Sequence, residues 1–317
     1  MQHGNLITDL LLILPSITLG IIMGGNDAGN ILGPTVANGI FKVKKALIVC
    51  SSMVILGAML GGLPGMKVAS SLVKLSISEV IIINLSASFV TFLFLMRKLP
   101  ISMTQAIVGA NVGVGILTKE LDPRVLLSIT FGWFLTPIVS YAISFVFFKL
   151  FSRIFREIKN IQIRSTLLRF MLWFFTVYGS YSLGANNAGK ITGILYNKGF
   201  NVIFLLTLSG ISLSIGIILL GRRTIYTVGR ELIHIDDFSA MVSISSSAFT
   251  IWIFSLIGLP ISAAHSIVGS ILGVGGANGT KITNKRTFQK IIFSWLEAPV
   301  YSGIFSAFLL SIYKLLW

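Results

Sequence analysis

The chain carries two pairs of matching segments, and both pairs are separated by the same distance along the sequence. Residues 24–40 read GGNDAGNILGPTVANGI, and 160 positions later residues 184–200 read GANNAGKITGILYNKGF, with 7 of 17 positions identical. The same offset places LPISMTQAIVGANVGVG, residues 99–115, on LPISAAHSIVGSILGVG, residues 259–275, with 10 of 17 identical. Chance would give roughly one or two matches per window in so apolar a chain. The sequence therefore indicates an internal duplication, and its copied segments are candidates for the functional core.

The composition indicates that lipid surrounds most of this chain. Hydrophobic residues make up 54% of it and charged residues only 11%. At about 20 residues per span, eight apolar runs are long enough to cross a bilayer. They occupy residues 6–22, 46–66, 80–96, 125–150, 167–183, 200–220, 238–259 and 291–316. Because these runs are apolar on every side, they favour helices over a membrane β-barrel. We predict an all-α, polytopic membrane protein.

The charged and metal-binding side chains exclude several classes of protein. The net charge of +15 comes from basic residues in short loops between apolar runs, as in cytoplasmic loops of membrane proteins, so no nucleic acid partner is expected. The single cysteine, Cys50, and the three histidines, His3, His234 and His265, show no metal-ligand spacing. No nucleotide-binding P-loop is present. We therefore expect neither an enzyme nor a cofactor.

Loop charges differ between the two halves. In inverted copies, a basic loop of one half corresponds to a neutral loop of the other, because each loop pair lies on opposite sides of the membrane. The basic residues at 42–45 correspond to the apolar residues 202–205. In the opposite sense, Arg222 and Arg223 correspond to the neutral residues 62–63. The charges thus predict two repeats of inverted topology.

This topology divides the chain into three parts. We expect a first repeat at residues 1–152 and a second at residues 165–317. Following the crossings from the basic residues at 42–45 places the basic linker between the repeats, residues 153–164, in the cytoplasm. Both termini are then outside the cell.

The repeated run Gly24–Asn30 combines glycines with amide and acid side chains. In membrane proteins such residues cluster where a helix is broken and faces a protected cavity. Asn26, Asp27 and Asn30 supply oxygen ligands suited to sodium, and a carboxylate in hydrocarbon needs a cation or proton partner. We expect a broken helix here, with Asp27 and Asn30 as the sodium ligands. The alternative is that the glycines only pack helices closely.

The second repeated motif is typical of a helix start. Pro100 and Pro260 suit a first helical turn. Helix N-termini carry partial positive charge and free N–H groups, so two that face each other form an anion site. The alternative is a capped packing helix. The expected substrate-binding residues are Ser102, Thr104, Gln105, Ser262, His265 and Ser266, with Asn26 and Asn186 from the first motif pair.

Together these motifs resemble the inorganic phosphate transporter (PiT) family of secondary carriers, over essentially the whole chain. The family's paired G-A-N-D-x-x-N motif is similar to Gly24–Asn30 and Gly184–Lys190. Its paired P-x-S-T-T-H-type motif is similar to Pro100–Gln105 and Pro260–His265. Its tryptophan–proline pair is similar to Trp133–Pro137 and Trp295–Pro299. The resemblance implies phosphate import with sodium or protons, a homodimer, and re-entrant helical hairpins that meet at the membrane midplane.

The chain departs from the family's pattern at several positions. Asn187 stands where the family usually has Asp, and Lys190 where it usually has Asn. A Lys190 side chain that faces the cavity would either occupy a cation position or strengthen anion binding. Three family threonines are replaced, at Met103, Ala263 and Ala264.

The pattern as a whole predicts a secondary active transporter in the cell membrane, which imports inorganic phosphate by cation-coupled alternating access. The coupling ion is sodium or a proton, and the expected coupling residues are Asp27, Asn30, Asn187 and Glu297. Glu297 is an intramembrane acid that acts in proton coupling or pairs with a basic side chain. The alternative substrate is sulfate or another tetrahedral oxyanion. An ion channel is disfavoured, because it would need a continuous lined pore.

Overall fold

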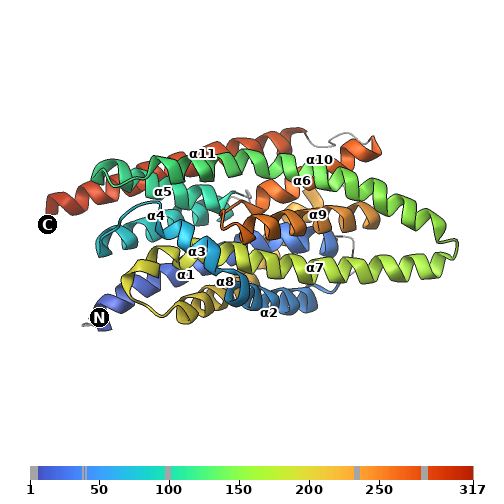
Figure 1. Ribbon diagram of the computed structural model, residues 1–317, viewed down its shortest axis with the longest axis horizontal. Coiled ribbons are helices and arrows are strands. Elements are labelled where there is room, and N and C mark those ends of the chain that lie inside the picture. Colours follow the sequence, from blue (N-terminus) through green and yellow to red (C-terminus); the bar gives the residue numbers. More distant parts are fainter. Residues whose placement is uncertain are drawn as a thin grey trace.

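The computed structural model describes residues 6–37, 39, 41–96, 101–231, 236–279 and 285–316. Long helices run along its longest axis (Figure 1). In chain order the elements are α1 (Leu6–Ala37), α2 (Val43–Gly61), α3 (Leu63–Ser70), α4 (Ile77–Met96), α5 (Met103–Thr118), α6 (Pro123–Glu157), α7 (Ile161–Thr192), the 3-10 helix η1 (Gly193–Lys198), α8 (Val202–Glu231), α9 (Asp237–Leu256), α10 (Ala263–Asn278) and α11 (Lys285–Leu316).

Seven helices in the described part of the chain are long and apolar enough to cross a membrane. They are α1, α2, α4, α6, α8, α9 and α11. The eighth expected run, residues 167–183, lies inside α7, whose 32 residues also include Arg164, Arg169 and Lys190. At about 1.5 Å per residue, α7 is long enough to span the hydrocarbon core. The chain is therefore a multi-pass membrane protein, as predicted.

Matching helices in the two halves begin and end at equivalent residues. α4 and α9 begin and end 160 positions apart, and so do α5 and α10. Ser102 caps α5, and its Oγ accepts the Gln105 N–H at 3.4 Å; Ser262 caps α10 and accepts the His265 N–H at 3.3 Å. Lys119 and Gly279, with φ of 61° and 74°, end these helices in the left-handed conformation.

The expected position of the second-motif proline is wrong for Pro260. Because Ser262 is the cap, α10 begins at Ala263, and Pro260 lies two residues before the cap instead of in the first turn. A proline at this position interrupts no helical hydrogen bond, since its missing N–H lies outside the helix. Pro100 lies outside the described residues.

The expected break at the first motif is also wrong. α1 continues through Gly24–Asn30, and α7 continues through the matching residues 184–190. The glycines admit the backbone of a neighbouring helix: a Cβ on Gly24 would overlap the Leu213 carbonyl of α8, and one on Gly184 would overlap the Val54 carbonyl of α2. Close packing therefore accounts for the glycines, while the Asn and Asp side chains require a separate explanation.

We expect Gly24→Ala to destabilise the protein by about 1–3 kcal/mol. The added methyl group would overlap the backbone of α8, which cannot move aside by changing a side-chain rotamer. Thermal unfolding of the purified protein in detergent measures this. Gly132→Ala in α6 is the matched control, since the nearest atom to its Cβ is Ile261 Cγ2 at 3.9 Å. Equal effects of the two changes would contradict the packing role.

Each half packs mainly on the other half. α1 contacts α8 and α7 contacts α2, while α5 contacts α11 and α10 contacts α6. The pattern is unchanged when the halves are exchanged. In Figure 1, α1 starts at the left end of the molecule and α7 at the right end, so these copies run in opposite directions. Both termini lie at the left, and the connection between α6 and α7 lies at the right.

Candidate substrate and ion site

Six side chains of the repeated first motif meet in the protein interior. They are Asn26, Asp27 and Asn30 of α1 and Asn186, Asn187 and Lys190 of α7, all at most 6% exposed, and we call them the polar cluster. Asp27 is its centre. Its Oδ1 accepts from Asn26 Nδ2 at 2.9 Å and Asn30 Nδ2 at 3.4 Å, and its Oδ2 accepts from Asn187 Nδ2 at 2.8 Å. The first motif of one half thus bonds directly to that of the other.

The two halves join their motifs in the same way. Asn26 Nδ2 donates to the Ile101 carbonyl at 3.1 Å, and Asn186 Nδ2 donates to the Ile261 carbonyl at 3.0 Å. Each isoleucine directly precedes the serine that caps α5 or α10. The polar cluster therefore lies against both helix starts.

The helix starts also meet each other. Thr104 Oγ1, in the first turn of α5, donates to the Ile261 carbonyl at 3.2 Å across 157 residues of sequence. In Figure 1, α4 and α5 lie in the part of the molecule that holds the termini, and α9 and α10 lie toward the α6–α7 connection. The positive ends of two helices consequently converge beside a buried carboxylate.

Lys190 inserts an ammonium group into this arrangement. Its Nζ donates to Asn187 Oδ1 at 2.8 Å and to the Ile261 carbonyl at 2.6 Å. Asn187 in turn donates to Asp27, so it bridges the buried cation and the buried anion. Formally the polar cluster holds one negative and one positive charge.

Within the described part of the chain, three of the predicted site residues have a buried polar atom without a partner: His265 and Gln105 at the helix starts, and Asn26 of the polar cluster. His265 Nδ1 lies 3.1 Å from the Trp133 carbonyl and therefore carries the proton, because a carbonyl oxygen only accepts. The His265 ring also packs on Trp295, with centroids 3.7 Å apart. The unpartnered atoms of these three residues are His265 Nε2, Gln105 Oε1 and Asn26 Oδ1. Such atoms call for a ligand or water.

Ser266 and Glu297 are not brought into the polar cluster. The Ser266 hydroxyl lies 3.1 Å from Ser247 Oγ and 3.0 Å from Ser140 Oγ, in a hydroxyl network that joins α10 to α9 and α6. Glu297 is half-buried on α11, and no described hydrogen bond links it to the polar cluster.

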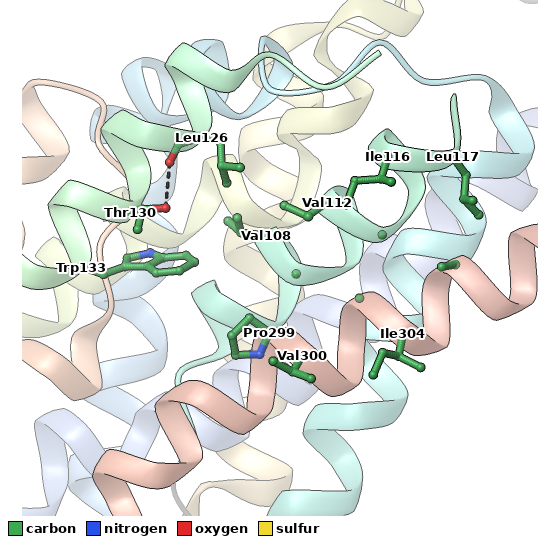
Figure 2. A pocket seen from close by; sticks show the side chains of 14 residues that line it. Val108, Val112, Ile116, Leu117, Leu126, Thr130, Trp133, Pro299, Val300 and Ile304 are labelled. Carbon is green, nitrogen blue, oxygen red and sulfur yellow. Dashed lines mark hydrogen bonds between the residues drawn. The ribbon is translucent and has the colours of Figure 1, made fainter. Parts of the chain in front are cut away.

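A cavity of about 470 Å³ lies between α5, α6 and α11, and its chemistry does not suit an anion. Figure 2 shows its walls, with Val108 and Val112 from α5, Trp133 from α6 and Ile304 from α11. The Thr130 hydroxyl donates to the Leu126 carbonyl at 2.9 Å within its own helix, as the dashed line shows. The cavity is therefore apolar and distinct from the polar cluster.

Sequence reasoning missed the backbone carbonyls of the site. Ile101 and Ile261 read as ordinary hydrophobic residues, yet their carbonyls receive the amides of the first motif. Their place directly before a capping serine is the available signal, because a residue there lies outside the helix and its carbonyl has no helical partner.

The chain is similar to known transporters in sequence and in fold. The sequence profile described as "Phosphate transporter family" matches residues 23–306. The chain is 28% identical to the sulfate permease CysP of Bacillus subtilis, over 96% of this chain and 88% of that protein. It is 32% identical over 162 residues to sodium-dependent phosphate transporter 1 of Rattus norvegicus, over 47% of this chain and 24% of that protein. A solved structure of a sodium-dependent phosphate transporter has the same fold, with a TM-score of 0.88 at 22% identity, over 98% of this chain and 100% of that one.

Proposed function

Because this chain belongs to the phosphate transporter family, we propose that it imports inorganic phosphate across the cell membrane by cation-coupled alternating access. The family is one of transporters, not enzymes. The observation that supports this proposal best is the meeting of two serine-capped helix starts beside a buried carboxylate. That arrangement offers positive helix ends to an anion and a negative oxygen to a cation.

The anion site lies between the starts of α5 and α10. The first N–H groups of a helix have no partner within it, so they are available to phosphate oxygens. The Ser102 and Ser262 hydroxyls accept backbone N–H groups, which leaves their own protons free to donate to a ligand. Thr104, Gln105 and His265 line the same site, with Asn26 and Asn186 behind them. Because the Thr104 proton bonds the Ile261 carbonyl and the His265 Nδ1 proton bonds the Trp133 carbonyl, His265 Nε2 is an acceptor that suits the hydroxyl of a protonated phosphate.

The coupling cation lies at Asp27. A carboxylate buried in a membrane protein needs a positive partner, and the carboxylate and backbone oxygens are hard ligands that suit sodium. The Asn30 side-chain nitrogen lies 3.4 Å from Asp27 Oδ1. Flipping the side-chain amide would exchange its nitrogen and oxygen and so place the amide oxygen beside Asp27 Oδ1. A proton on Asp27 is the alternative coupling ion. The homodimer expected from the family resemblance stays a prediction.

Uptake of labelled phosphate into proteoliposomes tests the function. We expect an inward sodium or proton gradient, imposed separately, to drive accumulation above the external concentration. Absence of accumulation under both gradients would contradict the proposal.

Sulfate is the second candidate substrate. It is favoured by the similarity to a sulfate permease over 96% of this chain, and by the loss of hydroxyl donors at Met103, Ala263 and Ala264. Excess unlabelled sulfate in the same assay separates the two. Weak competition by sulfate supports phosphate, and saturable gradient-driven uptake of labelled sulfate with no uptake of phosphate would establish the alternative.

The inverted topology makes a separate prediction, supported by the loop charges and by the opposite courses of α1 and α7 (Figure 1). In a Cys50→Ser background, we expect Lys44→Cys and Arg222→Cys to react with an impermeant thiol reagent only from the cytoplasm. Glu120→Cys should react only from outside. All three side chains are exposed, so access depends on the side of the membrane. A reversed result at any one position would contradict the topology.

A further inference from the structure

The two halves of the polar cluster are built alike, but they differ at two of their three paired positions: Asp27 corresponds to Asn187, and Asn30 corresponds to Lys190. In both halves an asparagine amide bonds the carbonyl before the capping serine, at 3.1 and 3.0 Å. In both, the side chain at the end of the motif donates to the residue three positions earlier: Asn30 to Asp27, and Lys190 to Asn187. The first half therefore shows what surrounds position 190 when no ammonium is there.

The Lys190 ammonium takes two oxygen atoms, Asn187 Oδ1 and the Ile261 carbonyl, at 2.8 and 2.6 Å. Their counterparts in the first half are Asp27 Oδ1, at the proposed cation site, and the Ile101 carbonyl. A side-chain oxygen with a backbone carbonyl is the donor set of a hard cation. In the second half, the ammonium occupies that donor set.

Charge accounts for its position. Lys190 is 5% exposed and Asp27 is 6% exposed, and a buried charge without compensation is strongly unfavourable. Asn187 bridges the two charges through hydrogen bonds of 2.8 Å on each side. Asn187 thus links the ammonium to the carboxylate, while both Asp27 oxygens accept hydrogen bonds from amides and make no direct bond to Lys190.

We propose that Lys190 is a tethered cation, which permanently fills the second half's cation position. This inference rests on the proposed function. It means that the wild-type protein moves one fewer mobile cation with each imported anion than a variant with asparagine at position 190 would move. The competing role is direct anion binding by the ammonium. Neutralising an anion ligand would weaken phosphate binding without changing the number of cations moved.

The test is the net charge moved per phosphate, obtained from the membrane potential at which net phosphate flux in proteoliposomes reverses. This readout counts cations whether they are sodium or protons. We expect Lys190→Asn to move one more positive charge per phosphate than the wild type, with Lys190→Arg unchanged. An unchanged number in Lys190→Asn, with lower phosphate affinity, would overturn the proposal in favour of anion binding.

A second measurement keeps this test separate from the proposed function. Purified protein in detergent is titrated with radioactive sodium, and we expect Lys190→Asn and Lys190→Met each to bind one more ion than the wild type. Equal sodium binding in all three proteins overturns the tethered cation. Failure of the wild type to accumulate phosphate contradicts the proposed function alone, because the sodium count does not depend on transport.

Discussion

Asp27→Asn is expected to abolish gradient-driven phosphate uptake. The change removes the acid that receives three amide hydrogen bonds at the centre of the polar cluster. At roughly 4 Å and an effective dielectric constant of about 20, a full charge contributes about 4 kcal/mol to the binding of a cation. Losing it lowers cation affinity by about three orders of magnitude. Exchange of phosphate without a gradient should fall as well, since Lys190 then lacks its buried counter-charge.

The measurement is labelled phosphate uptake, with folding checked by size-exclusion chromatography and thermal unfolding. Asp122→Asn is the matched control, because it makes the same chemical change at a helix cap outside the polar cluster. The double variant Asp27→Asn/Lys190→Asn restores the neutrality of the polar cluster. If Asp27→Asn alone does not fold, uptake is therefore measured with the double variant, and Lys190→Asn serves as its reference. Full gradient-driven uptake by folded Asp27→Asn protein would refute the coupling role.

Ser102→Ala and Ser262→Ala are each expected to weaken phosphate binding about 10- to 150-fold, the loss of one hydrogen bond of about 1.5–3 kcal/mol to a charged ligand. Both hydroxyls lie at helix starts that meet through Thr104, and both are at most 2% exposed. The concentration of phosphate that half-saturates binding in detergent measures the effect.

Helix capping by the same serines must be separated from ligand binding. Glycine retains most of a cap's stability but has no hydroxyl, so Ser262→Gly should weaken binding as much as Ser262→Ala while unfolding at nearly the wild-type temperature. Ser245→Ala is the control, because that hydroxyl donates to Val242 within its own helix at 2.9 Å. If all these changes have equally small effects on binding, the serines only cap helices.

The repeat in the sequence was sufficient to predict that two matching helices start in this region, but not that α10 begins after Ser262 instead of at Pro260. Two serines 160 positions apart, each followed by the same Ile-Val-Gly pattern, indicated matching helices, and α5 and α10 have equivalent limits. The charge of Asp27 in an apolar chain likewise marked the centre of the polar cluster, because burial of a carboxylate requires partners.

The course of α1 and the contacts of Lys190 were beyond the same reasoning. Glycines at positions 24 and 25 favour a bend when only local propensity is considered. In the fold α1 is continuous there, and Gly24 packs on the backbone of α8, about 190 residues away, which local propensity does not report. The sequence does not decide between two roles for Lys190, because one of its two partners is the backbone carbonyl of Ile261, which no side-chain pattern reports.

The exchange of helices between halves has a consequence for biosynthesis. α1 contacts α8, and Thr224 Oγ1 donates to the Gly25 carbonyl across 199 residues. At a synthesis rate of roughly 5–20 residues per second, α8 follows α1 from the ribosome after about 10–40 s. For that interval a helix with a carboxylate and a bare glycine face sits in the membrane without its partner. A first half made alone would therefore lack the helix that covers the glycine face of α1.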